Sequence, residues 1–285
     1  MSTAPPDGSW LPPVAASPEQ PPVQEGGAPR WAPSSAWLAL VTAFMFAIVG
    51  AVVVGLVGTI FGASFRDPPP AVNIAATVVQ DIAFIGTAIL FAGRAGTVLP
   101  AQFGFVRTRL GRAVGLMAAA YFAYAILSQV WAQLVHTHAK DNLPTSLGVN
   151  ESTAALVAVC VLVTVIAPLA EETFFRGFFF GALRNWRGPW PAALLTGAVF
   201  GAIHVGSAPV VFLLPLAIFG VALCIVRWQT GSLLPCIALH ATNNALAFGV
   251  TEHWTAGQIL LLGIGAVAVT MLVCLPLLGV RARVA

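Results

Sequence analysis

Charged side chains are scarce in this sequence. Of its 285 residues, 8% are Asp, Glu, Lys or Arg, whereas 58% are hydrophobic and the mean hydropathy is +0.89. Soluble domains contain about 25% charged residues, so the composition excludes an ordinary soluble domain and indicates a polytopic membrane protein. The sequence also has no basic run interleaved with aromatic residues, which argues against a nucleic-acid partner.

Cysteines spaced as metal ligands are missing as well. The sequence has four cysteines, all within apolar segments and without the spacing of a metal site: Cys160, Cys224, Cys236 and Cys274. We expect buried free thiols that behave as small hydrophobic side chains. No HExxH motif and no tandem repeat of fixed period is present, so the sequence carries no zincin signature.

The first 35 residues have no hydrophobic periodicity and are rich in Pro, Gly and Ser. This composition predicts a disordered tail over residues 1–35, on the cytoplasmic side. It lacks a basic stretch followed at once by an apolar one, so we do not expect a cleavable signal peptide. A solvated tail without a specific role and a docking segment are both compatible with it.

Apolar stretches near the spanning length of about 20 residues follow the tail. We count eight and predict an all-α bundle of about eight transmembrane helices over residues 36–280. The stretches run at about 36–62, 70–92, 113–135, 153–183, 190–206, 209–227, 232–250 and 256–279.

The distribution of Lys and Arg predicts the orientation, because cytoplasmic loops collect these residues. With eight spans and the N-terminus inside, eleven of the thirteen Lys and Arg residues fall inside, and only Arg66 and Lys140 fall outside. We therefore expect both termini in the cytoplasm. The fourth stretch is too long for one span, about 46 Å of helix, and we expect Pro168 to kink or interrupt it.

Three polar clusters stand inside the apolar stretches, where a central charge costs roughly 2.5–3.5 kcal/mol. They are Glu171-Glu172-x-x-x-Arg176, Phe200-x-x-x-His204 and His240-x-x-x-Asn244. Residues four apart share a helix face, so each cluster presents its side chains together. A hairpin centred near residues 187–188 would bring the first two clusters to one depth. Two GxxxG pairs, at 177–181 and 197–201, favour close helix contacts there.

The residue types indicate hydrolysis. Glu171 with His204 could hold and deprotonate a water molecule, directly or through a metal. His240 and Asn244 could stabilise the oxyanion of a tetrahedral intermediate. Arg176 would neutralise Glu172 rather than react. Each cluster alone also fits a structural role: a salt bridge at a helix boundary, a packed histidine, or polar contacts between helices.

Asp81, in the second stretch, is a further intramembrane acid and therefore a candidate functional group. We favour a structural partner for it, such as Arg176 or His204, over a catalytic role.

The ordered triplet resembles the CAAX protease and bacteriocin-processing family (CPBP, or Abi), which includes the CAAX prenyl endopeptidase. The family's motifs EExxxR, FxxxH and HxxxN/D match Glu171 to Arg176, Phe200 to His204, and His240 to Asn244. The resemblance covers about residues 150–250. It implies an eight-helix bundle with a polar chamber and an intramembrane endopeptidase that cleaves a membrane-associated peptide.

The resemblance also implies roles for individual residues. Glu171 and His204 activate water, while His240 and Asn244 stabilise the oxyanion; Glu172, Arg176 and Phe200 support them. Members are named metalloproteases, and Glu171, His204 and His240 could bind zinc or another divalent metal with water as the fourth ligand. The same groups also serve a metal-free glutamate mechanism, which we favour.

The substrate and the alternative functions stay open at this point. A CAAX-type C-terminus is the best-known target of the family. The composition, rich in Pro, Ala and Gly and poor in Lys, is typical of bacteria, so we favour a leader peptide or membrane-protein tail and the plasma membrane. A non-catalytic scaffold or bacteriocin-immunity protein is the alternative. A transporter is disfavoured because no paired inverted repeats are evident.

Overall fold

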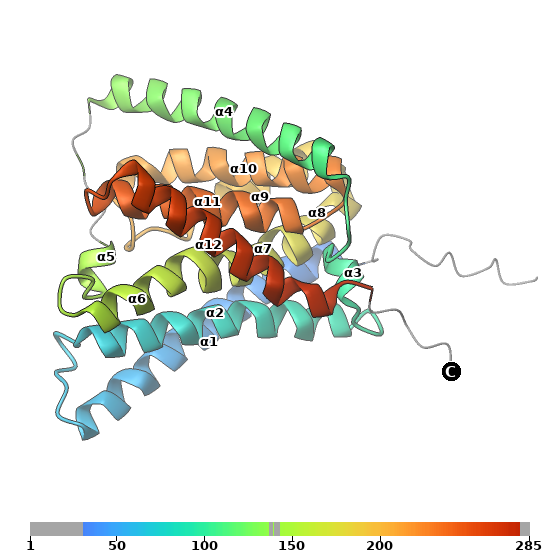
Figure 1. The fold of residues 1–285 in the computed structure, drawn as a ribbon. Helices are drawn as coiled ribbons and strands as arrows, with labels where there is room; N and C mark the ends of the chain where they lie inside the picture. Colours follow the sequence, from blue (N-terminus) through green and yellow to red (C-terminus); the bar gives the residue numbers. More distant parts are fainter. Residues whose placement is uncertain (1–30, 137–138, 140–142, 280–285) are drawn as a thin grey trace, which may run out of the picture.

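The computed structural model describes residues 31–136, 139 and 143–279, and no β-strand occurs among them. The long helices run side by side and alternate in direction, with α4 along one edge and α1 and α2 along the opposite edge (Figure 1). The predicted all-α membrane bundle is therefore confirmed. Its helices are α1 (Pro33–Ile60), α2 (Pro70–Gly93), α3 (Pro100–Phe103), α4 (Leu110–Val135), α5 (Leu143–Ser146), α6 (Thr153–Val161), α7 (Ala167–Glu172), α8 (Phe180–Arg187), α9 (Pro189–Ala202), α10 (Leu213–Thr230), α11 (Leu234–Thr251) and α12 (Ala256–Cys274), with the π-turns η1 (Leu162–Ile166) and η2 (Thr173–Phe179) and the 3₁₀ turns η3 (Val210–Phe212) and η4 (Leu275–Leu277).

Each of the eight predicted apolar stretches contains a helix or a helical run, but they differ in length. Within the described residues, six helical runs are long and apolar enough to span a membrane. Of the two others, α9 has 14 residues, about 21 Å of helix against a hydrocarbon core of about 30 Å. The other, α11, carries His240 and Asn244. Eight spans and cytoplasmic termini remain predictions.

The fourth stretch is one continuous helical run from Thr153 to Arg187. Pro168 does not end it, because the chain widens into the π-turn η1 directly before the proline. There the Ala167 N–H donates to the Leu162 carbonyl, five residues back. A second π-turn, η2, follows Glu172. Such turns inside α-helices often accompany functional sites, and these two flank the glutamate pair.

The predicted tail lies mostly outside the described residues, which begin at residue 31. Of its last five positions, Trp31 is buried, with its ring 5.2 Å from that of Phe103 and 5.0 Å from that of Phe178. Helix α1 begins two residues later at Pro33, in agreement with the preference of proline for the first helical turn. The packed region thus starts a few residues before the predicted boundary.

Phenylalanine side chains fill the centre of the bundle. The completely buried rings come mostly from one helical run and its neighbours: Phe174, Phe175, Phe178, Phe179, Phe180, Phe200 and Phe219. Aromatic rings give large contact areas with defined edge-to-face geometry, as between Phe175 and Phe200, whose rings are 5.3 Å apart at 86°. This packing fixes the helix that carries the first polar cluster against α9.

The two GxxxG pairs make close contacts, as the sequence predicts, but with different neighbours. A Cβ atom on Gly197 would lie 2.7 Å from the carbonyl oxygen of Ala217, so this pair lets α9 approach α10. Gly177 instead lies against Phe103, and Gly181 lies against Trp31. The small residues therefore allow three different close contacts: α9 with α10, Gly177 with Phe103, and Gly181 with Trp31.

Charged residues are divided between the two ends of the bundle. Arg66 and three acids lie in loops or helix termini at one end: Asp67, Glu151 and Glu252. Seven arginines lie near the helix ends that meet at the other end, on the right in Figure 1: Arg94, Arg107, Arg109, Arg112, Arg184, Arg187 and Arg227. We call this the basic end. The arginine-containing loops that the sequence assigns to one side of the membrane lie together at this end.

Candidate active site

A buried ion pair forms the base of the site, and it confirms the pairing predicted from the spacing of Glu172 and Arg176. Nη1 of Arg176 donates to Oε1 of Glu172 over 2.7 Å, and both side chains are 0% exposed. The same oxygen accepts a second hydrogen bond from Nδ1 of His240, over 2.8 Å. Glu172 thus connects two of the three motifs.

Arg176 is fixed by contacts beyond Glu172. Its Nη2 donates to the carbonyl oxygen of Gly220 over 3.2 Å. The guanidinium carbon lies 4.2 Å from the centre of the Phe200 ring, a cation–π distance that stabilises a desolvated cation. Phe200 therefore supports the charge of Arg176 as well as packing against the histidines.

His240 presents one ring nitrogen to Glu171. Because the Glu172 carboxylate can only accept at Nδ1, that nitrogen carries the proton. The other nitrogen, Nε2, lies 3.9 Å from Oε2 of Glu171, a separation at which one water molecule can contact both atoms. The rings of Phe200 and Phe219, at 5.9 and 5.6 Å, hold the imidazole from two sides.

Three acidic side chains, which we call the carboxylate cluster, have more acceptor oxygens than donors around them. Asp81, Glu171 and Glu172 all have buried oxygens without a hydrogen-bond partner among the described residues: both of Asp81, Oε2 of Glu171 and Oε2 of Glu172. Asp81 and Glu171 are close enough for their charges to interact. Buried acceptors of this kind require protons, water or a ligand.

The surroundings of Asp81 differ from those predicted. Its side chain is 1% exposed, and neither Arg176 nor His204 pairs with it in the described part of the chain. The expected structural partner was therefore wrong. Asp81 lies near Glu171 instead, because α2 packs against α7 and η2.

His204 lies outside a helix, whereas the sequence predicted a helix through residue 206. Helix α9 ends at Ala202, and His204 occupies the following turn. Its Nδ1 donates to the Phe200 carbonyl oxygen over 2.7 Å, so Nε2 is the nitrogen left for chemistry. Across the residues that the structure describes, no hydrogen bond or ion pair joins His204 to Glu171.

Asn244 shares a face of α11 with His240 and contacts the π-turn η1. Its Nδ2 donates to the carbonyl oxygen of Val163 over 2.8 Å. Asn243 donates to Oδ1 of Asn244 over 3.4 Å. A wide turn leaves backbone carbonyls in need of donors, and the side chain of Asn244 supplies one. This leaves one N–H of the amide for another acceptor.

The candidate metal ligands do not form a set of three. Glu171 and His240 approach each other, whereas His204 contacts the ring of Phe200 and has no hydrogen bond or ion pair to Glu171 among the described residues. In the described ranges no three His, Cys, Asp or Glu side chains are grouped as metal ligands. This arrangement does not fit a zinc site with three protein ligands, and we assign no chemical step to a metal.

Comparison with known proteins places the three motifs within one family match. Residues 153–246 match the family described as Type II CAAX prenyl endopeptidase Rce1-like. The resemblance noted from the three motifs is therefore confirmed, and the matched segment contains all three of them. It also contains both π-turns and the buried Glu172–Arg176 pair.

Relatives come from several bacteria. The chain is 30% identical over 141 residues to an uncharacterized 24.3 kDa protein of Escherichia coli, covering 48% of this chain and 62% of that protein. It is 24% identical to UPF0177 protein YxdF of Lactococcus lactis, covering 47% of this chain and 75% of the relative. It is 29% identical to the uncharacterized protein YyaK of Bacillus subtilis, with 47% and 46% covered. No solved structure is significantly similar to this chain.

Sequence reasoning missed two features of the site. One is the hydrogen bond from His240 to Glu172, since residues 68 positions apart give no spacing signal. The other is the pair of π-turns. The apolar length of 153–183, too long for one span, was the available signal for an irregular helix.

Proposed function

We propose that this protein is an intramembrane endopeptidase that uses Glu171 to activate the attacking water. The supporting observation is the arrangement of Glu172, Arg176 and His240. The buried ion pair holds Nδ1 of His240, so that Nε2 faces the unpartnered Oε2 of Glu171 across 3.9 Å. A water molecule bound there contacts a base on one side and a polarisable imidazole on the other.

In this mechanism Glu171 takes a proton from the water as its oxygen bonds to the peptide carbonyl carbon. In this proposal His240 enters the cycle with a proton on both ring nitrogens, donates from Nε2 to the resulting oxyanion and leaves the cycle in the same state. The Glu172 carboxylate accepts the hydrogen bond from Nδ1, and Arg176 balances the charge of Glu172. Glu171 then gives its proton to the leaving nitrogen as the C–N bond breaks, which restores the carboxylate.

His204 and Asn244 act beside this pair. The second N–H of Asn244 is a further oxyanion donor, because the first is already held by Val163. The bond from Nδ1 of His204 to the Phe200 carbonyl leaves Nε2 for a contact with water or substrate, next to the Phe200 ring. We assign His204 to the substrate side, where it orients the attacking water or the peptide.

The family match favours a membrane-associated peptide or protein as substrate, with a CAAX-type C-terminus or a leader peptide as the two classes to test. The six apolar helical runs give a lipid environment. We place the protein in a bacterial plasma membrane with both termini in the cytoplasm, so the basic end would face the cytoplasm.

The test compares peptide termini in membranes from cells that express the wild type or Glu171→Gln at equal levels. Glu151→Gln is the matched control. It makes the same chemical change at an exposed residue, at the end of the bundle away from the basic end. Termini present with the wild type and the control but absent with Glu171→Gln would support proteolysis and identify the substrate. Identical termini in all three samples, with folded protein, would overturn the proposal.

The alternative is a binding scaffold or immunity protein without catalysis. The complete burial of Glu172 and Arg176 favours it, because such a pair can be entirely structural. On that hypothesis Glu171→Gln preserves the cellular phenotype, whereas substitutions on the exposed faces of the bundle abolish it.

A further inference from the structure

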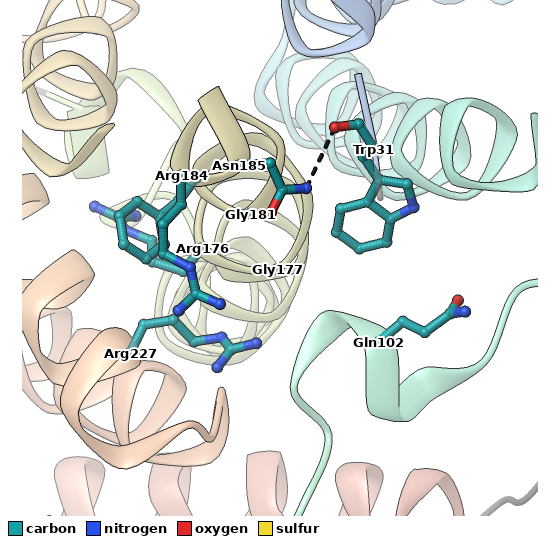
Figure 2. Close-up of a pocket in the computed structure, with 9 residues that line it drawn as sticks. Trp31, Gln102, Arg176, Gly177, Gly181, Arg184, Asn185 and Arg227 are labelled. Carbon is teal, nitrogen blue, oxygen red and sulfur yellow. Dashed lines mark hydrogen bonds between the residues drawn. The ribbon is translucent and has the colours of Figure 1, made fainter. Parts of the chain in front are cut away.

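A second polar site lies toward the basic end, on the other side of Arg176 from Glu172. It is a cavity of about 20 Å³, lined by three arginines together with Trp31 and Asn185. Figure 2 shows Arg176, Arg184 and Arg227 gathered on one side of the helix that carries Gly177 and Gly181, with Trp31 on the other side. We call this the arginine cavity.

The arginines of this cavity have N–H groups without acceptors. Nε of Arg176 and Nε of Arg227 are both buried, and neither has a hydrogen-bond partner in the part of the chain that the structure describes. Arg176 is 0% exposed, so bulk water does not solvate its free N–H. A buried donor without a partner costs about 1–3 kcal/mol, which a ligand in the cavity would remove.

The cavity also has excess positive charge. Glu172 balances Arg176, but no carboxylate among the described residues pairs with Arg184 or Arg227. These two arginines are close enough to repel each other. The guanidinium of Arg227 is held against Gly104, where a Cβ atom would lie 2.5 Å from Cζ, and its Nη2 donates to the Phe103 carbonyl. It is thus kept beside the cavity despite the repulsion.

We propose that the arginine cavity binds one small monovalent anion of halide size, such as chloride. The volume of about 20 Å³ is enough for about one or two water-sized particles, which fits a halide better than the larger phosphate and sulfate ions. Water alone would satisfy the N–H groups but would leave the charges of Arg184 and Arg227 uncompensated, whereas an anion satisfies both requirements. This proposal goes beyond the proteolytic function and does not depend on it.

Arg176 connects this site to the active site. Arg176 donates to Glu172 through Nη1, lines the cavity, and has an Nε without a hydrogen-bond partner among the described residues. An anion at Nε would draw the guanidinium toward the basic end. This movement would change its hydrogen bond to Oε1 of Glu172, the oxygen that also accepts from His240. The anion is therefore a positioning ligand for Arg176 and not a reactant.

The experiment measures thermal unfolding of the full-length protein in detergent by tryptophan fluorescence, without any cleavage assay. Chloride replaces gluconate stepwise at constant ionic strength. For the wild type we expect Tm to rise by about 2–4 °C and to saturate, and bromide to give a similar rise. Arg227→Gln and Arg184→Gln should abolish the saturable rise. Arg109→Gln, an exposed arginine of the same end, should keep it.

Several outcomes would overturn the proposal. A flat response of the wild type would mean that water fills the cavity. An equal rise in all four proteins would be a general salt effect. A rise with acetate but not with chloride would indicate a carboxylate site in place of a halide site. If Arg227→Gln does not fold, Arg184→Gln carries the test, since the Arg184 side chain lines the cavity and its contact within the described residues is with the Phe180 ring.

Discussion

The carboxylate cluster and the arginine cavity are opposite in character although Arg176 separates them by a single side chain. The cluster has acceptor oxygens without donors, at Asp81, Glu171 and Glu172, whereas the cavity has N–H donors without acceptors, at Arg176 and Arg227. Each region lacks what the other has in excess. Glu172 and Arg176 neutralise each other, but the remaining oxygens and N–H groups of the two regions are not paired in the described part of the chain, so each region is left with capacity for a proton, a water molecule or an ion.

The same contrast distinguishes the two adjacent glutamates, Glu172, which has an ion-pair partner, and Glu171, which has a free oxygen. Glu172 and Arg176 satisfy each other and are completely buried, whereas Glu171, the adjacent residue, keeps a free oxygen and is 12% exposed. Adjacent glutamates on one helix thus point to different surroundings, since successive residues are about 100° apart. Burial and pairing identify Glu172 as the anchor and leave Glu171 as the reactive candidate.

The largest effect is expected from Arg176→Met, which removes the side chain that divides the two regions. Glu172 would then stay buried with His240 as its single partner, and breaking such a pair costs about 3–5 kcal/mol. Chemical unfolding in detergent measures the loss. The double variant Glu172→Leu with Arg176→Met should recover most of it, because neither member of the Glu172–Arg176 ion pair is then left buried without the other. A double variant as unstable as the single one would show that packing on Phe200, and not charge, was lost.

Next in size is Glu172→Gln. It weakens two charge-assisted hydrogen bonds, to Arg176 and to His240, and we expect a loss of about 1.5–3 kcal/mol in unfolding free energy. Glu171→Gln is the matched comparison and should cost less than about 1 kcal/mol, since its Oε2 has no partner to lose. Equal losses in the same unfolding assay would contradict the division between anchor and reactive glutamate.

Asp81→Asn should stabilise the protein by roughly 1–2 kcal/mol. The amide has the shape of the carboxylate, removes one acid from the carboxylate cluster and adds N–H donors where acceptors are unpartnered. The corresponding change at the exposed Asp67 is the control and should leave Tm unchanged. A lower Tm for Asp81→Asn would mean that the carboxylate has a partner which compensates its burial.

The smallest effect is expected from Asn244→Ala. It removes the hydrogen bond to the Val163 carbonyl and should cost about 1 kcal/mol, with faster amide exchange in η1 as the local signature. Asn243→Ala serves as the neighbouring control. If exchange in η1 stays unchanged, the π-turn does not need this donor.

Much of the fold was predictable because composition and length determine it. Apolar stretches of about 20 residues form helices in a membrane whatever their detailed sequence, and spacing four apart was enough to pair Glu172 with Arg176. The end of α9 before His204 was not predictable in this way, because the apolar residues Ile203 and Val205 continue the pattern past the last helical turn.

Contacts between residues distant in sequence were the other part of the structure that could not be predicted. The bond between His240 and Glu172, the docking of Trp31 on Phe103, and the approach of Arg227 to Gly104 join residues distant in sequence. No local period encodes such contacts. Trp31 was assigned to the tail for this reason, since it lies beside Pro-rich sequence and its partners are 72 and 147 positions away, at Phe103 and Phe178.

The π-turn η2 gives the helix between the two regions an adjustable joint. Each such turn accommodates about one residue more than an α-helix of the same rise, so it behaves as a one-residue insertion within a continuous rod. Deleting one residue from η2 would restore the α-helical hydrogen-bond pattern, and the residues after the joint would keep nearly the same orientation because the wide turn had absorbed the extra residue. Arg184, after the joint, and Glu171 and Glu172, before it, would therefore stay aimed as they are, and the side chains of η2 itself would move. The packing of this segment can thus be changed by a change in length that leaves both flanking halves of the helix in place.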